Sequence, residues 1–556
     1  MNINNLKTRK IFVTTALPYA NGKLHIGHIM EFIQADIWVR FQRMQKNIEV
    51  YFIGADDTHG VPVMLEAKKK KKKIEEFIYN INIERKKLLK KFYISFDNYY
   101  ITDSIENHIL SKKIYLYLRD KSKMISFKKV EQFFDLKKKI FLSDRYIKGT
   151  CPKCDALNQN SDFCEICGSV YSLMELKNPY SIFSNKKIIK KKSDHIFFLL
   201  SKKKCINFLS KWIFKKPKFQ TEVINKAKEW LLKNNLKDWD ISRDYPYFGI
   251  KIPDTLNKYF YVWLDAPIAY ISSLKNFLDR KNINYNFFLK DKYTEQYHFI
   301  GKDIIYFHIL FWPAILKFSK NKLPTNIFVH GFITINGKKL SKSNNYRICP
   351  LKYLNLGFNP EWLRYYIAYK LNSKIKDIDL NIDDFIYRIN SDLIGKYINI
   401  PSRISKFICN NFNYKLNTNW GVKYYYLLRN IKGIFNNIYK FYEERNFKKV
   451  LYFIMKIINK INIYINFNKP WNFFKKDKNL QKICSYLLEC FRIITIYLKP
   501  ILPLLSIKIE KFLNINFLSW LDIKKTLPNN HSINYYKHLL KKVDLNIKEK
   551  LFKNFY

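Results

Sequence analysis

Residues 11–28 read IFVTTALPYANGKLHIGH, and this stretch decides the fold class. Its first six residues are mostly β-branched or aromatic, which is the profile of a buried strand. A loop with proline and glycine follows, and a helical pattern then occupies residues 25–44. A second short apolar run lies at 50–53. Strand, loop, helix and strand in this order predict a βαβ unit that opens a Rossmann-type doubly wound parallel sheet, of the α/β class.

Two histidines, His25 and His28, stand at the start of the predicted helix. They are three residues apart and therefore share one helical face. A helix N-terminus attracts phosphate, and two imidazoles add donors for charge that develops on it. Gly27 leaves room where a nucleotide would come close. We predict a nucleotide site here. The alternative, two polar helix residues without a role, is less favoured because the motif directly follows the first strand and its loop.

A second phosphate-binding motif is predicted at 338–343, KKLSKS. It follows an apolar run at 327–333 and the turn Asn336-Gly337. Amines and hydroxyls on a flexible loop suit a triphosphate that must be clamped and then released. Paired lysines are common in a chain this basic, so the motif gains its meaning from the histidine motif far upstream.

Four of the nine cysteines form two CxxC pairs, namely Cys151 with Cys154 and Cys164 with Cys167. This spacing presents four thiolates tetrahedrally, which is the closed geometry of structural zinc. No ligand position is left for a substrate, so one structural Zn²⁺ is predicted. Nine cysteines in 556 residues are too sparse for a disulfide scaffold, and the other five are expected to be buried small hydrophobic residues.

The motifs HIGH at 25–28 and KLSKS at 339–343 together resemble the signature pair of class I aminoacyl-tRNA synthetases. Leu340 stands where that family usually has methionine, and 344–346 lacks the usual Arg-Gly. Further stretches resemble the methionyl enzymes in particular, in the right order along essentially the whole chain. They are ALPYANG at 16–22, GADDTHG at 54–60, WDISRD at 239–244, YVWLDAP at 261–267 and FIGKDI at 299–304.

The resemblance implies a methionyl-tRNA synthetase activity. Such an enzyme activates L-methionine with ATP and Mg²⁺, releases pyrophosphate, and transfers methionine to the 3′ end of tRNA(Met), initiator and elongator. By resemblance, His25, His28, Lys339 and Lys342 would stabilise the leaving pyrophosphate. The other implied ATP contacts are Gly27, His298, Gly301 and Asp303. The implied methionine-binding residues are Leu17, Tyr19, Asp56, Arg243, Trp263, Ala266, Pro267, Tyr270 and His308.

The chemistry of methionine agrees with this set. Its thioether is apolar and polarizable, so aromatic rings such as those of Tyr19 and Trp263 are good partners for its sulfur. Asp56 resembles the family's carboxylate for the substrate ammonium, and Arg243 is a candidate for the substrate carboxylate or a phosphate. Outside this motif context, core packing would explain each aromatic residue about as well.

Beyond residue 395 the pattern becomes helical, with apolar residues three and four apart at 427–442 and again at 450–465. An all-α domain that binds the tRNA anticodon is therefore expected. The resemblance places its base readers at Asn399, Arg403, Pro470 and Trp471. Pro401 lies between the first two and lacks a backbone N–H, so the helix is expected to begin or kink there.

Five parts are expected along the chain. Sheet-like segments at 259–264, 297–300 and 327–333 follow a lysine-rich insertion. The expected parts are a first Rossmann half at 1–115, a connective insertion at 116–240 with its zinc knuckle at 151–167, a second Rossmann half at 241–335, a KLSKS loop and stem-contact region at 336–395, and an α-helical anticodon-binding domain at 396–556.

The net charge is +54, from 100 Lys and Arg against 46 Asp and Glu. A folded RNA partner would explain it, and so would compositional drift, because Asn, Ile, Phe and Tyr are also over-used; both readings stay open. No uninterrupted apolar run reaches the roughly 18 residues of a membrane span, and the run at 11–16 is too short for a signal peptide. We expect a cytoplasmic protein without a membrane partner, and a monomer, since the chain ends soon after its helical part.

Three other functions compete with this interpretation. Class I synthetases for leucine, isoleucine or valine usually carry a large editing insertion, for which this chain is too short. A catalytically decayed synthetase that acts as an RNA-binding protein is conceivable, and ATP–pyrophosphate exchange would distinguish it. A zinc-ribbon nucleic-acid-binding protein would explain only 151–167.

Overall fold

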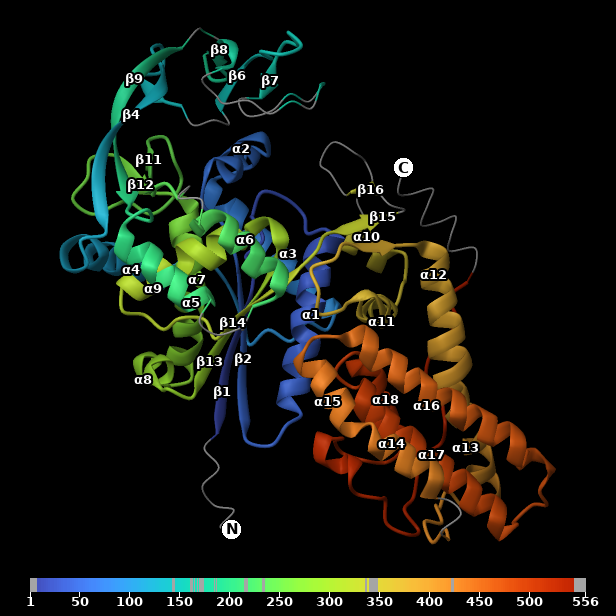
Figure 1. Ribbon diagram of the computed structural model, residues 1–556. Coiled ribbons are helices and arrows are strands. Elements are labelled where there is room, and N and C mark those ends of the chain that lie inside the picture. Colours follow the sequence, from blue (N-terminus) through green and yellow to red (C-terminus); the bar gives the residue numbers. More distant parts are fainter. Residues whose placement is uncertain are drawn as a thin grey trace.

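The computed structural model describes residues 8–142, 146–160, 164, 166–167, 169, 175–184, 186, 188–214, 219–232, 236–335, 338–339, 349–421 and 425–544. Its centre is a five-stranded sheet in the order β14-β13-β1-β2-β3, in which every pairing is parallel (Figure 1). The bounds are β1 Arg9–Thr15, β2 Ile48–Asp56, β3 Asn98–Ile101, β13 Thr294–Gly301 and β14 Asn326–His330. The predicted Rossmann-type sheet is confirmed.

The side chains of β1 alternate between two cores, as the two-residue period of a strand requires. Ile11 and Val13 belong to the core beneath α1 (Ile26–Arg43), whereas Phe12 belongs to the core beneath α7 (Val262–Arg280). Both faces of the sheet are therefore covered, as is usual for parallel sheets. Chain order reverses on the two sides of β1, so the crevice at the carboxyl ends of β1 and β13 is where such a sheet binds ligands.

Two of the expected sheet-like segments differ from the structure. Residues 259–264 form sheet only in β12 (Lys258–Phe260), and α7 begins at Val262, because apolar residues then recur with helical spacing through Leu274. The segment 327–333 is divided between β14 and β15 (Ile333–Ile335), which belongs to a separate three-stranded sheet. A short apolar run does not reveal by itself where one element stops.

An insertion stands on the carboxyl-end side of the sheet (Figure 1). Its stem is an antiparallel pair, β4 (Ile125–Asp135) and β9 (Ile189–Phe198). At the far end lies a small sheet in the order β7-β6-β8, with β6 at Ile147–Thr150, β7 at Gln159–Asn160 and β8 at Lys177–Ser181. The first cysteine pair follows β6, and the second follows β7. The stem also reaches back to the main sheet, because residues 130–133 of β4 line the cavity described below.

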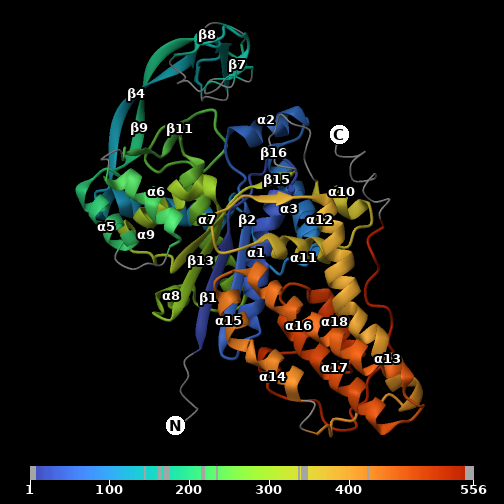
Figure 2. The ribbon, with the colours of Figure 1, turned by 45° about the vertical axis from the view of Figure 1, so that its right-hand side comes forward.

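The C-terminal part is helical, as predicted, and packs beside α1 (Figure 2). The apolar pattern at 427–442 falls on two helices, and that at 450–465 on one. The helices are α10 Pro350–Asn355, α11 Pro360–Lys370, α12 Ile382–Tyr387, the π-helix η7 Arg388–Ile398, α13 Asn399–Asn411, α14 Tyr425–Gly433, α15 Phe435–Glu443, α16 Phe447–Asn468, α17 Lys478–Leu498 and α18 Pro503–Phe512.

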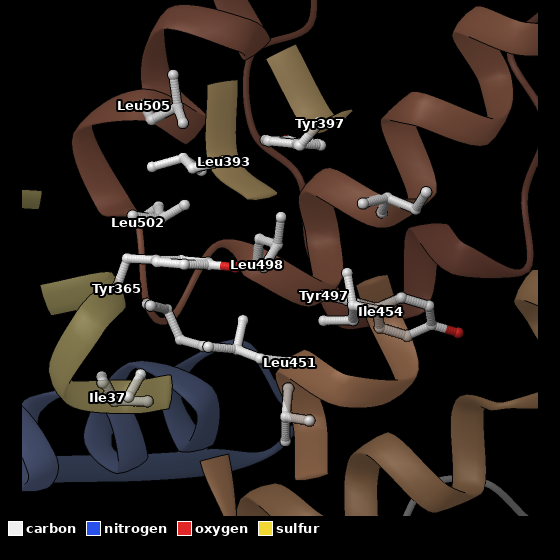
Figure 3. Close-up of a cluster of buried hydrophobic side chains, with 14 of the residues drawn as sticks. Ile37, Tyr365, Leu393, Tyr397, Leu451, Ile454, Tyr497, Leu498, Leu502 and Leu505 are labelled. Atoms are coloured by element: carbon white, nitrogen blue, oxygen red, sulfur yellow. The ribbon is translucent and has the colours of Figure 1, made fainter. Parts of the chain in front are cut away.

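A single apolar cluster joins the helical part to the Rossmann domain. Figure 3 shows Ile37 of α1 close to Tyr365 of α11 and Leu451 of α16, all buried in this cluster. At the same junction, Arg364 and Asp36 form an ion pair of 2.7 Å with both side chains fully buried. The two parts therefore share one core.

By length and composition, the segment Phe447–Asn472 is apolar enough to cross a membrane, and 39% of its most apolar window is buried. The buried residues of α16 recur every three or four positions and contact α11, α15 and η7. This one-sided burial is the pattern of a helix in a packed bundle.

Candidate active site

A cavity of about 1110 Å³ lies at the carboxyl ends of the central strands. It is lined by the loop after β1, the start of α1, the loop after β2, the start of α7 and the loops after β13 and β14. Most of the predicted ATP and methionine contacts line it. They are Leu17, Tyr19, His25, Gly27, His28, Arg243, Trp263, Ala266, Pro267, Tyr270, Gly301, Asp303 and His308.

The two histidines form the N-terminal cap of α1. Nδ1 of His25 accepts the backbone N–H of Gly27 at 3.1 Å, and Nδ1 of His28 accepts that of His25 at 3.1 Å. Because both Nδ1 atoms accept, each neutral ring carries its proton on Nε2. The ring centroids are 3.7 Å apart. A Cβ on Gly27 would lie 2.9 Å from the His25 ring, so a larger residue here would displace that ring from its capping position.

An aromatic chamber forms the α7 side of the cavity. Trp263 stacks on Phe307 with ring centroids 3.7 Å apart, and Tyr270 is hydrogen-bonded to Nε2 of His308 at 2.9 Å. Nδ1 of His308 bonds to the carbonyl of Ile304 at 3.0 Å, so it carries the proton and Nε2 accepts from the tyrosine hydroxyl. Burial lowers the pKa of His308 to about 4, so the ring is neutral.

The aspartate doublet at the end of β2 is divided between core and cavity. Asp56 receives hydrogen bonds from Arg85 and Tyr99, both at 2.6 Å, and from Asn82 at 2.8 Å, and it does not line the cavity. Asp57 does line it, and its buried Oδ1 has no hydrogen-bond partner. The prediction for Asp56 is therefore corrected: the neighbouring residue supplies the carboxylate that faces the cavity.

His298, predicted as an ATP contact, does not line the cavity either. It is fully buried in β13, hydrogen-bonded to Thr14 at 2.6 Å and to Gln296 at 3.1 Å, and receives the indole N–H of Trp312 at 3.3 Å. Its ring does not line the cavity, because alternation along β13 turns it into the core under Tyr270.

His330, at the end of β14, is the histidine that lines the cavity on this side, and the sequence interpretation missed it. Its Nε2 lies 2.9 Å from Glu31 of α1, and Glu31 also accepts the backbone N–H of Ala16 at 2.8 Å. The signal was present, since a histidine directly after a buried strand lies at the ligand-binding edge of such a sheet.

Arg243 lies at the base of the insertion and lines the cavity. Its guanidinium carbon is 3.8 Å from the ring centroid of Tyr261, and its Nη1 is 3.5 Å from Asp240. Stacking on an aromatic ring fixes the guanidinium plane while leaving its N–H groups able to bind an anion. The remaining predicted phosphate contacts, the Lys339 side chain and Lys342, lie outside the described residues.

The four predicted zinc ligands lie together. All their sulfur atoms are within 4.8 Å of one another, with Cys151 and Cys167 at 3.8 Å and Cys154 and Cys164 at 3.5 Å. Zn–S bonds of about 2.3 Å in a tetrahedron place sulfurs about 3.8 Å apart, so the cluster fits Zn²⁺. Backbone N–H groups of Lys153 and Cys167 point at two of the sulfurs, both at 3.4 Å, which suits thiolates.

The helical part brings Arg403 of α13 and Trp471 together, with the guanidinium carbon 4.8 Å from the indole centroid. Trp471 is 48% exposed, whereas Pro470 is buried. Pro401 lies in the first turn of α13, which continues η7 without interruption, so the helix does not begin at the proline as expected; instead, the helical geometry changes from π to α at Asn399. The side chain of Asn462 donates to the carbonyl of Lys396 at 3.1 Å, just upstream of the proline.

Comparison with known proteins defines the class and then the family. Residues 11–405 match the family model of class I tRNA synthetases (M), and 425–550 match an anticodon-binding domain of tRNA ligases. The methionine–tRNA ligase of Janthinobacterium sp. (strain Marseille) is 54% identical over 548 residues, covering 98% of this chain and 78% of that protein. That of Herminiimonas arsenicoxydans is 51% identical, covering 99% and 80%. The chain belongs to the methionine–tRNA ligase family of class I tRNA synthetases.

A solved structure shares the fold. The methionyl-tRNA synthetase of Mycobacterium tuberculosis in complex with methionyl-adenylate superposes with a TM-score of 0.79 at 21% identity, covering 96% of this chain and 99% of that one. The arrangement of Rossmann domain, insertion and helical part is thus that of a known synthetase architecture.

Proposed function

We propose that this chain activates L-methionine with ATP to methionyl-adenylate and transfers methionine to the 3′ end of tRNA(Met), initiator and elongator. The observation that carries the proposal is one cavity that joins the capped histidine pair, the aromatic chamber and the buried, unpartnered oxygen of Asp57. These three features fit a triphosphate, a thioether side chain and an ammonium group, respectively. Both family models and the relatives named above support it.

In the first step, the methionine carboxylate attacks the α-phosphate of ATP and pyrophosphate leaves. Such chemistry needs reactants held in line and charge neutralised more than a protein nucleophile. Asp57 would hold the ammonium, while Trp263 and Tyr270 would enclose the thioether. His25 and His28, at the positive N-terminal end of α1, are proposed to donate their Nε2–H groups to phosphate oxygens of ATP, and Lys339 and Lys342 are proposed to assist them. Mg²⁺ would enter as the MgATP complex.

In the second step, the terminal ribose hydroxyl of tRNA attacks the adenylate carbonyl and AMP leaves. Trp471 is proposed to stack on an unstacked anticodon base, next to Arg403, whose guanidinium contacts the indole. Asn399 and Pro470 are proposed as further anticodon contacts. The cysteine cluster is proposed to hold one structural Zn²⁺ that keeps the tip of the insertion folded.

The five-part division given by the sequence remains our proposal for the functional organisation of the chain. We also propose that the protein is a cytoplasmic monomer. Light scattering tests the second point: a mass near 67.3 kDa supports it, and twice that mass contradicts it. No observation on the described residues favours a decayed synthetase.

Amino-acid-dependent ATP–pyrophosphate exchange tests the proposal directly. Purified, zinc-loaded protein is expected to exchange with methionine and not with leucine, isoleucine or valine. The reason is that an aromatic chamber favours the unbranched, polarizable side chain of methionine over branched side chains. Charging of tRNA(Met) then tests the second step separately.

A further inference from the structure

A row of ionisable side chains runs from the buried surroundings of the proposed ammonium site toward the surface. His59, two residues after Asp57, lies between two carboxylates: its Nδ1 is 2.6 Å from Asp265 and its Nε2 is 3.3 Å from Asp103. Asp103 is also 2.8 Å from Nε2 of His108. The side chains of His59 and Asp265 are 1% and 0% exposed, so this pair is fully removed from water.

The chain meets the cavity at Asp57. The carboxylate of Asp57 accepts a backbone hydrogen bond from His59, and the charge of Asp265 acts on it directly. Two buried carboxylates in mutual range disfavour each other's ionisation, because each negative charge raises the cost of the second. Asp57 can therefore bind an ammonium well only if the charge of Asp265 is offset within the protein.

From this geometry we propose that His59 is a positioning residue that acts through Asp57. Its ring offsets the negative charge of Asp265, so that Asp57 carries the charge that receives the substrate ammonium. The inference rests on the proposed function, because it assigns the methionine ammonium to Asp57. It adds a residue whose ring does not line the cavity.

The directions of the pKa shifts of His59 and Asp57 agree with this role. Burial would lower the pKa of His59, but Asp265 and Asp103 raise it to about 10, so the ring is charged at neutral pH. Burial and then Asp265 raise the pKa of Asp57 well above its usual value, and the His59 charge opposes them. Methionine binding is thus expected to weaken as pH falls through the pKa of Asp57.

The other ionisable groups that face Asp57 leave His59 as its cationic neighbour. Asp56 is neutralised by Arg85 at 2.6 Å. The charge of Asp57 also acts on three tyrosine hydroxyls, those of Tyr19, Tyr247 and Tyr270. Burial raises the pKa of each hydroxyl, so all three are neutral. A competing role is available for the outer groups, since His59, Asp103 and His108 have ligand atoms close enough to share a metal ion. That role would require His59 to lose its charge.

The test is methionine-dependent ATP–pyrophosphate exchange across pH on the full chain, comparing wild type with H59Q, D265N, the double variant and H108Q. H59Q is expected to raise the methionine KM about tenfold, with little change in the ATP KM. The pH below which kcat/KM for methionine falls, the acid limb of the profile, should rise by about one unit, because the pKa of Asp57 rises without the His59 charge. The double variant is expected to recover part of both effects. H108Q, whose side chain is 37% exposed, is the control and should stay near wild type.

If H59Q does not fold, the pH profile of D265N alone still tests the inference. Removing the negative charge beside Asp57 is expected to move the acid limb to lower pH, a shift that structural damage would not produce. Equal losses in kcat and in both KM values with an unmoved limb, a double variant no better than H59Q, or a second bound zinc per chain would each overturn the inference. Absence of exchange in wild type would instead contradict the proposed function.

Discussion

Asp56 and Asp57 are adjacent in sequence, yet Asp56 is ion-paired with Arg85 in the core while Asp57 lines the cavity. Substitution of Asp57 should therefore weaken methionine binding, whereas substitution of Asp56 should destabilise the fold. D57N is expected to raise the methionine KM about a hundredfold, because a buried charge–charge hydrogen bond contributes roughly 2–5 kcal/mol. Its unfolding temperature should stay close to that of wild type.

D56N is the matched control. It leaves the Arg85 guanidinium buried without its counter-charge, which costs about 3–5 kcal/mol of folding free energy. Denaturant unfolding measures this loss, and exchange kinetics measure the methionine KM. If D56N weakened methionine binding while D57N unfolded the protein, the assignment of the two carboxylates would be reversed.

The start of the sheet was predictable, whereas the division of this doublet was not. The pattern at 11–28 specifies strand, loop and helix by local propensity and periodicity. Which of two adjacent aspartates faces a cavity depends on where β2 ends and on Arg85, 29 residues away in sequence, so it is a tertiary property. The same holds for His298, which strand alternation turns into the core, and for His330.

Trp263 is expected to provide one wall for the methionine side chain. Replacing it by alanine removes the ring that stacks on Phe307, and with it apolar area and a sulfur–aromatic contact of about 0.3–1.5 kcal/mol. The methionine KM should rise at least tenfold with the ATP KM unchanged. W212A, which removes a ring packed on Phe219 outside the cavity, is the control. Equal effects of both variants on methionine KM would exclude Trp263 from the pocket.

The cysteine cluster predicts one bound zinc per chain. C164S should lose this metal, because a fourth thiolate closes the tetrahedron, and the small sheet around β6 should become sensitive to protease. Atomic emission measures the metal, and limited proteolysis measures the loosening. C349S, a cysteine outside the cluster, should retain zinc. Full zinc content in C164S would contradict the assignment.

Trp471 is expected to act in tRNA charging but not in amino-acid activation. Stacking on a base contributes about 1–3 kcal/mol, so W471A should lower kcat/KM for tRNA(Met) by about tenfold or more. Exchange without tRNA should be unaffected. F287A removes another exposed aromatic residue, at 80% exposure on α8 (Tyr285–Lys290) of the catalytic domain, and should leave charging intact. An equal loss in F287A would point to a general surface effect.

In the helical part, as for Asp56 and Asp57, local structure could be predicted from the sequence but a contact between distant residues could not. Its helical periodicity was visible, whereas the start or kink expected at Pro401 is replaced by a change from π- to α-helical geometry within a continuous helical run. The approach of Arg403 to Trp471 brings together residues 68 positions apart, and it depends on how α13 packs in the bundle. Motif resemblance named both residues, but only the structure shows that they are in contact.

Amino-acid-dependent ATP–pyrophosphate exchange on the purified, zinc-loaded chain tests the central claim most directly. We expect exchange with methionine, none with leucine, isoleucine or valine, and a methionine KM about a hundredfold higher in D57N. Exchange with a different amino acid would contradict the assignment of the aromatic chamber, and no exchange from the folded protein would contradict the proposed activity itself.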